Sequence, residues 1–418
     1  MITPLRFHRS LLTGVIALLG PSAVLFACAT DNGDAVHGPQ FGPVPERPDG
    51  TAGRDGPVVS EDGGPLPDGG GGDANDAAQP PVCTSGTVAV LAGGDTTLTG
   101  TAQINGGMWS GSAIAGGAAL SAPSLVALGS GFVGLTQGAS NALHSVTYTA
   151  SWSAATPVGT LTTVATPALT LLGTKAQAVF LSGGADPNKF NRIENAGTSW
   201  TTAGDLVPQP PTTTPSAGTI AAAGAELWLA QDGQNNGLYI QKWDGAWGAA
   251  AGVVGAGTFS AAPPALAAIT GKFDLVLLYP GKDAPNVIGY ATRDATTKAW
   301  GNGSVTQGLA QTTEQMSVVQ ISASVVMVTF RGNNGKPYYM TGALGISSIS
   351  WSTPAQLLPD SSTVDSPPSV AKGVCGDDAI AVYASAGQVK ATRYRGTVWT
   401  APEPVLGASG SRVSVATR

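Results

Sequence analysis

The chain of 418 residues contains 58 Gly and 30 Pro, and only 11% of its residues are charged. Its length exceeds that of a typical domain, and the abundant Gly and Pro disfavour a helical bundle, so we expect many short strands joined by turns. Twenty basic and 26 acidic residues give a net charge of −6, with no basic block that could neutralise phosphates. This composition excludes a nucleic-acid partner and a cationic helix lying on a membrane surface.

Residues 1–27 are typical of a secretory signal peptide, because two arginines precede an apolar run from Leu11 to Ala27 that is short for a membrane span. The run ends in Leu25-Phe26-Ala27-Cys28, which resembles the lipobox of bacterial lipoproteins. The resemblance implies a diacylglycerol on the thiol of Cys28 and an exported protein anchored in the lipid bilayer. Because Ala29 rather than Asp follows, it also implies an outer-membrane or cell-surface lipoprotein. A transmembrane anchor or an ordinary signal peptide is the alternative.

Residues 28–82 are expected to form a disordered tether that begins at the lipidated cysteine. Positions 29–82 contain twelve Gly, nine Pro and ten acidic residues, with Arg47 and Arg54 as the basic ones. Such a composition buries too little apolar surface to offset the entropy of an ordered chain. A random coil of this length spans about 40 Å between its ends, which holds a following domain clear of a lipid surface.

The remaining part of the chain, residues 83–418, is poor in the side chains that most enzymes use. Its 16 basic and 16 acidic residues cancel, His144 is its one histidine, and Cys83 and Cys375 are its two cysteines. A zinc site of several His and Cys ligands cannot be assembled from this set, and a Ser-His-Asp triad could be built only on His144. We therefore expect no catalytic residue, no metal and no cofactor, with His144 on the surface of a strand.

A tryptophan recurs at a nearly fixed interval through residues 83–418, and this repeat predicts the architecture. The seven positions are Trp109, Trp152, Trp200, Trp247, Trp300, Trp351 and Trp399, separated by 43, 48, 47, 53, 51 and 48 residues. Upstream of each later Trp comes a start signal, usually proline: Pro123, Pro167, Pro215, Pro264, Met316 and Pro368. A unit of about 48 residues has room for four short antiparallel strands, which is the size of one propeller blade.

The expected fold is an all-β, seven-bladed β-propeller of four-stranded antiparallel blades over residues 83–418. The first unit supplies runs for the second, third and fourth strands only, whereas residues 412–416 read as an unaccompanied first strand. We expect this C-terminal strand to complete the first blade, because an open ring would expose unpaired strand edges. Cys83 and Cys375 then lie on the two sides of the seam. We expect a disulfide between them in an exported protein, with free cysteines as the alternative.

One group of ligand-binding candidates is aromatic and lies in the fourth unit. Trp243 falls outside the Trp repeat, and Tyr239 and Asp244 lie close to it in the sequence. Aromatic rings stack on the flat C–H faces of sugars, and carboxylates accept hydrogen bonds from hydroxyl groups. Packing between blades is the alternative role for each of these residues.

A second group lies in loops that are polar and varied. In a propeller, the loops between second and third strands share one face with the loops that link successive blades, and variable loops on a repeating scaffold are where binding specificity resides. These loops contribute five candidates to the predicted binding face: Asp232, Asn235, Arg331, Asn333 and Lys336. Turn formation is the alternative role of Asn and Asp at such positions.

Two short motifs resemble those of known propellers. The stretch Leu238–Trp247, and more loosely Val389–Trp399, is similar to blade motifs of fucose-binding propeller lectins and sialidase-like propellers. The lectin resemblance implies sugar binding by an Arg, a Glu and a Trp at blade junctions, a set that the sequence does not match residue by residue. Asn195–Trp200 resembles the Asp-box turn of sialidases, with Asn at the Asp position.

The arginines and carboxylates argue against the enzymatic alternative, a glycoside hydrolase. A sialidase needs three arginines that converge near the axis, whereas Arg192, Arg293 and Arg393 are expected on third strands away from it. Glycosidases also need two carboxylates with different pKa values, and most acidic residues here lie in predicted turns. We therefore expect a monomer that binds a glycan or an envelope protein without catalysis. A glycoside hydrolase and a non-binding envelope scaffold stay open as alternatives.

Overall fold

A computed structural model describes most of the chain from Cys83 onward. The described residues are 83, 85–183, 189–197, 199–201, 205–206, 218–233, 236–252, 260–301, 304–306, 310–358 and 362–418. The predicted signal peptide, Cys28 and the predicted tether lie outside them. Among the described residues, no helix has the length and apolar character that crossing a membrane requires.

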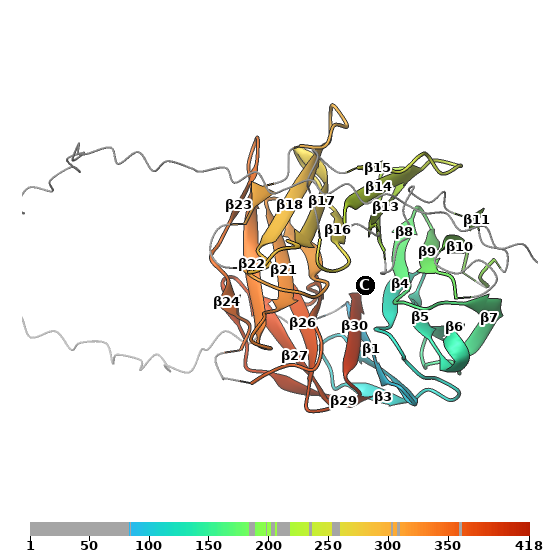
Figure 1. Cartoon of the computed structure of the whole chain (residues 1–418). Helices are drawn as coiled ribbons and strands as arrows, with labels where there is room; N and C mark the ends of the chain where they lie inside the picture. Colours follow the sequence, from blue (N-terminus) through green and yellow to red (C-terminus); the bar gives the residue numbers. More distant parts are fainter. Residues whose placement is uncertain are drawn as a thin grey trace, which may run out of the picture. The chain divides into compact units, whose positions relative to one another are not determined.

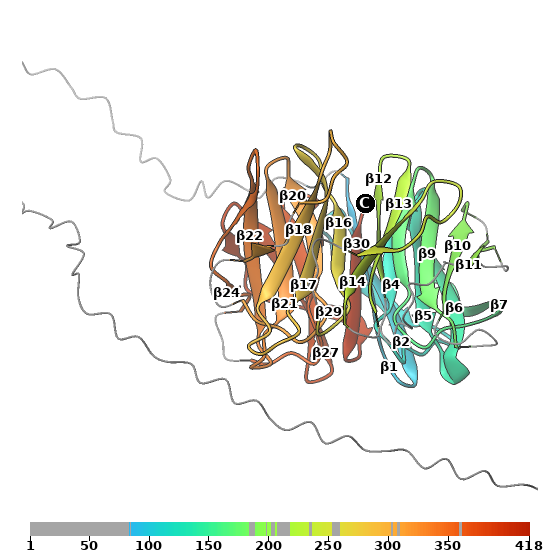
Figure 2. The same cartoon turned by 45° about the horizontal axis from the view of Figure 1, so that its top comes forward.

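Seven antiparallel sheets surround a central axis and form a β-propeller, as predicted (Figures 1 and 2). We number the sheets as blades 1 to 7 in chain order and give each from its innermost strand outward. Blade 1 is β30 (Arg412–Thr417), β1 (Thr87–Gly94), β2 (Thr97–Ile104) and β3 (Ser110–Ala113). Blade 2 is β4 (Ser124–Leu128), β5 (Gly131–Gln137), β6 (Ala142–Tyr148) and β7 (Thr156–Thr162). Blade 3 is β8 (Ala168–Leu172), β9 (Lys175–Leu181), β10 (Phe190–Asn195) and β11 (Asp205–Leu206). Blades 4 and 5 are β12 (Thr219–Ala223), β13 (Glu226–Asp232), β14 (Leu238–Trp243), β15 (Ala251–Gly252); and β16 (Ala265–Ala268), β17 (Phe273–Pro280), β18 (Ile288–Asp294), β19 (Ser304–Val305).

The last two blades carry a fifth strand at the outer edge. Blade 6 is β20 (Ser317–Ser322), β21 (Val325–Arg331), β22 (Pro337–Leu344), β23 (Ile349–Trp351), with β24 (Ala355–Gln356) also pairing β22. Blade 7 is β25 (Ser369–Lys372), β26 (Ala379–Ser385), β27 (Gln388–Arg395), β28 (Val398–Trp399), with β29 (Glu403–Ser409) also pairing β27. One 3-10 turn, η1 (Ala139–Asn141), lies in the hairpin of blade 2. The predicted four-stranded blade is therefore the rule, extended in blades 6 and 7.

The sequence signals of each unit match the strand positions. Pro123, Pro167, Pro264, Met316 and Pro368 each come immediately before an innermost strand. In blade 4, β12 follows Gly218, and the predicted start signal Pro215 lies outside the described residues. Second strands are covered on both faces by neighbouring blades, so they are continuous apolar runs, and β5 is buried along its whole length.

The C-terminal strand closes the ring, as predicted. β30 pairs antiparallel with β1 from Val88 opposite Thr417 to Gly93 opposite Arg412. β30 also packs between β25 of blade 7 and β4 of blade 2, so it is the innermost strand of blade 1. This pairing satisfies the inner edge of β1, which otherwise would expose a row of unpaired backbone groups.

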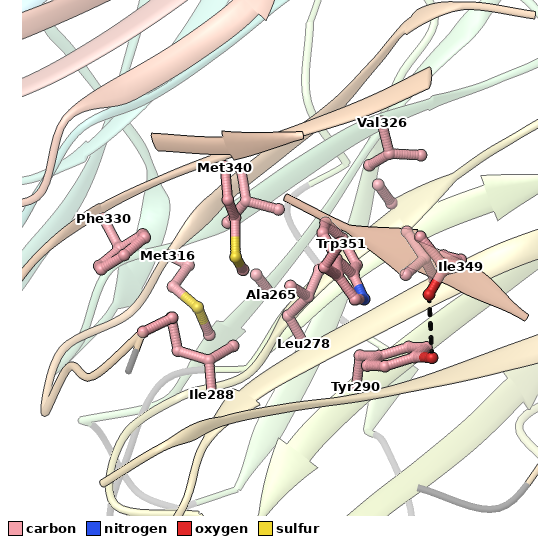
Figure 3. Packing of buried hydrophobic residues seen from close by; sticks show 14 of the residues in the cluster. Ala265, Leu278, Ile288, Tyr290, Met316, Val326, Phe330, Met340, Ile349 and Trp351 are labelled. Carbon is pink, nitrogen blue, oxygen red and sulfur yellow. Dashed lines mark hydrogen bonds between the residues drawn. The ribbon is translucent and has the colours of Figure 1, made fainter. Parts of the chain in front are cut away.

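Each tryptophan of the repeat contacts the preceding blade. Trp200 of blade 3 donates from Nε1 to Ser145 Oγ of blade 2 at 2.9 Å. Trp351 of blade 6 lies edge-on to Tyr290 of blade 5, with 5.5 Å between ring centroids, inside a cluster that both blades build (Figure 3). The other five tryptophans of the repeat also contact the blade that precedes their own: Trp109, Trp152, Trp247, Trp300 and Trp399. The repeat is therefore a packing device between sheets.

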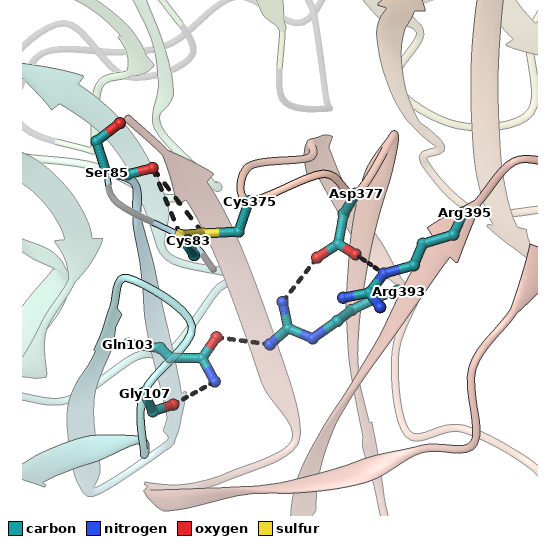
Figure 4. The surroundings of a disulfide bond; sticks show 8 residues. All are labelled: Cys83, Ser85, Gln103, Gly107, Cys375, Asp377, Arg393 and Arg395. Carbon is teal, nitrogen blue, oxygen red and sulfur yellow. Dashed lines mark hydrogen bonds and ion pairs between the residues drawn. A yellow bond between two sulfur atoms is a disulfide. The ribbon is translucent and has the colours of Figure 1, made fainter. Parts of the chain in front are cut away.

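Polar side chains and a disulfide join blades 1 and 7 at the seam (Figure 4). Cys83 and Cys375 form the predicted disulfide, with their Cα atoms 4.7 Å apart. Beside it, the buried carboxylate of Asp377 accepts hydrogen bonds from Arg393 and Arg395 of the same blade. Arg393 Nη2 then donates to Gln103 Oε1 of blade 1 at 2.6 Å. The seam is thus fixed by backbone pairing, by a covalent bond and by a charge-assisted hydrogen bond.

Removal of the disulfide is expected to lower the stability of the folded ring. The bond joins residues 292 positions apart. Closing so long a loop lowers the entropy of the unfolded chain, which stabilises the folded state by roughly 5 kcal/mol. The double variant Cys83→Ser/Cys375→Ser is therefore expected to unfold at a lower urea concentration than the parent chain. The single variant Cys28→Ser is the control, since Cys28 lies outside the pair. An unchanged urea midpoint in the double variant would contradict this account.

Candidate functional site

The loops that link blades and the hairpins between second and third strands meet on one face. In four blades, a backbone N–H of the linking loop donates to a carbonyl of the hairpin. The pairs are Thr163 N to Asn141 O at 2.8 Å, Ser260 N to Asn236 O at 2.8 Å, Thr312 N to Asn286 O at 3.2 Å and Val364 N to Gly335 O at 2.9 Å. The linking loops and the hairpins therefore form one surface, joined by backbone hydrogen bonds. We call this surface, which was predicted to bind a ligand, the loop face.

The hairpin residues that accept these bonds are turn formers. Asn141, Asn236 and Asn286 have φ between +59° and +63°, and Gly335 has φ of +77°. Asn and Gly adopt this left-handed region more readily than other residues, so the backbone explains their presence. The turn-forming alternative therefore holds for these four positions.

A pocket of about 550 Å³ opens on the loop face at the junction of blades 5 and 6. It draws on three parts of the chain: the linker between the two blades, the hairpin of blade 6 and the outer edge of blade 6. Its lining residues are Gln311, Phe330, Gly332, Asn333, Asn334, Tyr338, Thr353 and Pro354. We call it the junction pocket.

Two stacked aromatic rings form the apolar wall of the junction pocket. Phe330 at the end of β21 and Tyr338 at the start of β22 lie 5.6 Å apart between centroids, with an interplanar angle of 17°. Gly332 makes room for this arrangement, because a Cβ at that position would lie 2.8 Å from the Tyr338 ring. Phe330 is buried and Tyr338 is half-buried, so the tyrosine presents the accessible part of the stack.

Amide side chains supply the polar part of the junction pocket. Asn334 Nδ2 donates to the Tyr338 hydroxyl at 2.9 Å, and Asn333 Nδ2 donates to the carbonyl of Pro285 in blade 5 at 3.3 Å. Gln311 adds a third amide from the linker. The described lining includes no Asp, Glu, His, Lys or Arg, so it offers hydrogen bonds and ring stacking without a general acid or base.

Three sequence-predicted candidates gather at this hairpin. Asn333 lines the pocket, and Arg331 and Lys336 flank it on the same hairpin. Arg331 is paired with the carboxylate of Glu314 in the linker and donates from Nε to the carbonyl of Val364 at 2.9 Å. Its role in this structure is to hold the two adjoining linkers against the hairpin.

The candidates of blade 4 do not form one site. Asp232 ends β13 at the loop face, whereas Trp243 ends β14 at the opposite end of the blade and Asp244 follows it there. The strand from Leu238 to Trp243 separates these two ends by about 17 Å. Tyr239 lies near the loop-face end of β14, half-buried, and Asn235 lies outside the described residues. The predicted aromatic group is therefore divided between two faces.

Trp243 is not the exposed ring that its place beside a turn suggests. The guanidinium of Arg192 in blade 3 lies 3.7 Å from the centroid of its ring, and Arg192 is also paired with Glu194 at 2.9 Å. The structure thus brings an Arg, a Glu and a Trp together at one blade junction, which the sequence alone did not reveal. Because the arginine itself occupies the ring face, this trio is a packed cation–π contact between blades.

The enzymatic residue sets do not assemble. Arg192, Arg293 and Arg393 lie in β10, β18 and β27, the third strands of blades 3, 5 and 7, so they do not converge on the axis. His144 is half-buried in β6, and burial lowers the pKa of its imidazole. Its Nδ1 has no hydrogen-bond partner among the described residues, so no carboxylate there orients the ring as a triad requires.

Asp232 has an unusual environment for a carboxyl group on this face. Its side chain is buried, and Oδ1 has no hydrogen-bond partner among the described residues. Burial raises the pKa of Asp232 to about 6. The pKa of an Asp side chain in an unfolded chain is about 3.9. At a pH between these two pKa values, Asp232 is protonated in the folded state and ionised in the unfolded chain. Asp232 therefore lowers stability as pH rises through this window, and the loss persists above it.

The variant Asp232→Asn is expected to be more stable than the parent chain at neutral pH. The gain in free energy of unfolding is about 3 kcal/mol at about pH 8 and close to zero at about pH 4, where Asp232 is protonated. Urea unfolding at these two pH values measures the difference. Asp244→Asn, a change at an exposed carboxylate, is the matched control. Equal effects of Asp232→Asn at both pH values would contradict the assignment.

Most of the junction pocket was not among the sequence-predicted candidates. Gln311, Phe330, Asn334, Tyr338, Thr353 and Pro354 come to the site from the linker, the hairpin and the outer edge of blade 6. A usable signal did exist for the aromatic wall. Phe330 and Tyr338 flank the predicted hairpin on both sides, and antiparallel pairing places such residues opposite each other, as the register Phe330 to Tyr338 shows.

No protein-family model and no curated protein matches the chain, but solved structures do. The BP39L lectin from Burkholderia pseudomallei superposes with a TM-score of 0.62 at 12% identity, covering 78% of this chain and 97% of the lectin. A fungal lectin from Aleuria aurantia, described as a six-bladed β-propeller with a novel fucose recognition mode, gives 0.47 at 16% identity, over 68% and 95%. The NanB sialidase from Streptococcus pneumoniae gives 0.47 at 10% identity, over 63% and 65%. At these identities the likeness to BP39L shows a shared β-propeller fold.

Proposed function

We propose that the propeller binds a neutral glycan at the junction pocket without catalysing a reaction. The observation that carries this proposal is the composition of the pocket: a stacked aromatic wall beside three amides, with no acidic or basic side chain in the described lining. Aromatic faces suit the C–H faces of sugar rings, and amides donate and accept hydrogen bonds with hydroxyl groups. A charged ligand would lose hydration in this pocket without meeting a side chain of opposite charge, which costs free energy.

The structural likeness to BP39L, a protein described as a lectin, supports a carbohydrate ligand. The described pocket residues include no carboxylate, which favours binding over hydrolysis, because hydrolysis needs two suitably placed carboxylates. An envelope protein is the competing partner, and a glycan array distinguishes the two. Stoichiometric co-purification of an envelope protein, with no glycan bound on the array, would overturn the proposal.

Replacement of Tyr338 tests the pocket directly. Tyr338→Ala removes the accessible ring of the aromatic wall, and we expect glycan affinity to fall at least tenfold, about the loss of one stacking contact. Tyr279→Ala is the matched control, because Tyr279 is a half-buried tyrosine of blade 5 that does not line the pocket. Glycan-array signals and calorimetric titration give the readout, with thermal unfolding to verify folding. Equal losses in both variants would remove the junction pocket from consideration.

We propose further that Cys28 carries a lipid anchor and that residues 29–82 tether the propeller to the bilayer surface of the exported protein. The lipobox-like Leu25-Phe26-Ala27-Cys28 and the Gly-, Pro- and Asp-rich segment after it support this arrangement. A single acyl chain binds a membrane only weakly, whereas the two chains of a diacylglycerol attach a protein stably to the bilayer.

The variant Cys28→Ser is expected to move the protein from the membrane fraction to the soluble fraction of cells that export it. Incorporation of radioactive palmitate should be lost in the same variant, because the thiol that receives the lipid is missing. Thr30→Ser is the control for a substitution close to Cys28 that keeps the thiol. Unchanged palmitate labelling of Cys28→Ser would refute the anchor.

A further inference from the structure

A second cavity of about 550 Å³ lies where the innermost strands begin, at the centre of the loop face. Residues from all seven blade starts or the loops that lead to them line it, among them Ser124, Ala168, Thr219, Pro263, Ser317, Ser369 and Ser414. We call it the central funnel. Its volume and that of the junction pocket both fall within the range of roughly 300–1,000 Å³ that is usual for small-molecule sites.

Hydroxyl groups of the funnel wall keep hydrogen-bonding capacity. Ser317 Oγ accepts from the N–H of Val370 at 3.0 Å, and Ser369 Oγ accepts from the N–H of Val415 at 3.2 Å, so each serine ties its inner strand to the next. Each hydroxyl also has one proton to donate. These donors point to a ligand rich in hydrogen-bond acceptors.

The described funnel wall is also nearly uncharged. Glu314 is the one charged residue in its lining, and that carboxylate is paired with Arg331. Both side chains of this pair are about one-third exposed, at 33% and 31%. The funnel therefore has the same chemical preference as the junction pocket, namely a neutral ligand with many polar groups.

One short segment connects the two cavities. Gln311 lines the junction pocket, and Thr313 and Glu314 line the central funnel. Three residues of extended chain span at most about 11 Å, so Gln311 and Glu314 lie no farther apart than that. Between them, the buried Thr312 donates from Oγ1 to the carbonyl of Arg331 at 2.7 Å, which fixes the segment to the hairpin of the pocket. The cavities are thus neighbours on the two sides of a ridge formed by Thr312–Glu314, a segment that Arg331 contacts.

We infer that the two cavities bind one oligosaccharide, with one sugar unit in the junction pocket and the next units crossing the ridge into the central funnel. The inference rests on the proposed function and extends it, because it specifies a chain of several units rather than a single sugar. The guanidinium of Arg331 is held beside the ridge by its contacts with Glu314 and the carbonyl of Val364. Its remaining N–H groups are donors for the hydroxyl groups of the bridging unit.

Filling the funnel mouth separates this inference from the proposed function. Thr313 is exposed and lines the funnel, so Thr313→Trp narrows it without removing a buried contact. Thr296→Trp is the matched control, because Thr296 is an exposed threonine in the turn between β18 and β19, at the opposite end of its blade. The probe is an array that prints the same terminal sugars as monosaccharides and as neutral chains of two to six units. The full chain is applied as the parent, Thr313→Trp, Thr296→Trp and Tyr338→Ala.

We expect the parent chain to bind the longer chains at least tenfold better than the matching monosaccharides. Thr313→Trp should lower the signal for longer chains to the monosaccharide level and leave the monosaccharide signal unchanged, whereas Tyr338→Ala should lower both. Binding that does not depend on chain length, or a length dependence that survives in Thr313→Trp, would overturn the inference and leave the junction pocket intact. Absence of binding to every glycan would overturn the inference together with the proposed function.

Discussion

Closure of the ring is the constraint on which the rest of this structure depends. Each tryptophan of the repeat packs against the preceding blade, so no blade is complete without the one before it, and blade 1 needs blade 7. The contact between those two requires β30 to pair with β1, after which Trp109 Nε1 donates to Glu403 at 3.0 Å. The disulfide between Cys83 and Cys375 also lowers the entropy of the unfolded chain, because it keeps these two residues joined in the folded and in the unfolded state. Cyclic packing of this kind has no weak end from which a blade could fray.

A closed scaffold leaves the loop face free to vary. The backbone bonds between linkers and hairpins, such as Thr312 N to Asn286 O at 3.2 Å, hold this face while the intervening side chains differ from blade to blade. At the junction of blades 5 and 6, the hairpin combines a stacked aromatic pair with several amides in the described lining. The site thus arises from the departure of one hairpin from the others, on a surface that the repeat has already made rigid.

The sequence predicted the scaffold well, because its signals are local. A Trp within or a few residues before each outer strand and a Pro, or Met316, just before most inner strands fall inside single units of the repeat, and the two cysteines fall at the seam. The site was predicted only in part, because its parts come from different units. Asn333 was found from its loop, whereas Gln311 reaches the pocket through the packing of blade 5 on blade 6. The contact between Arg192 and Trp243 was missed for the same reason, since the arginine belongs to the neighbouring blade and lies 51 positions earlier.

The distribution of charge links the scaffold to the proposed ligand. Residues 83–418 contain equal numbers of acidic and basic side chains, 16 of each, and several pair within or between blades. Arg293, for example, is 1% exposed and joins blade 5 to Glu226 of blade 4 at 2.8 Å, while its guanidinium covers Trp228. A buried arginine of this kind must be paired, so its partner is fixed in the blade junction and does not reach a cavity. Charges used in this way hold the ring together, and they leave the described walls of both cavities almost neutral. A ligand that carries net charge would have to give up water there without gaining a counter-ion, whereas a neutral sugar gives up only hydrogen bonds that amides and serines replace.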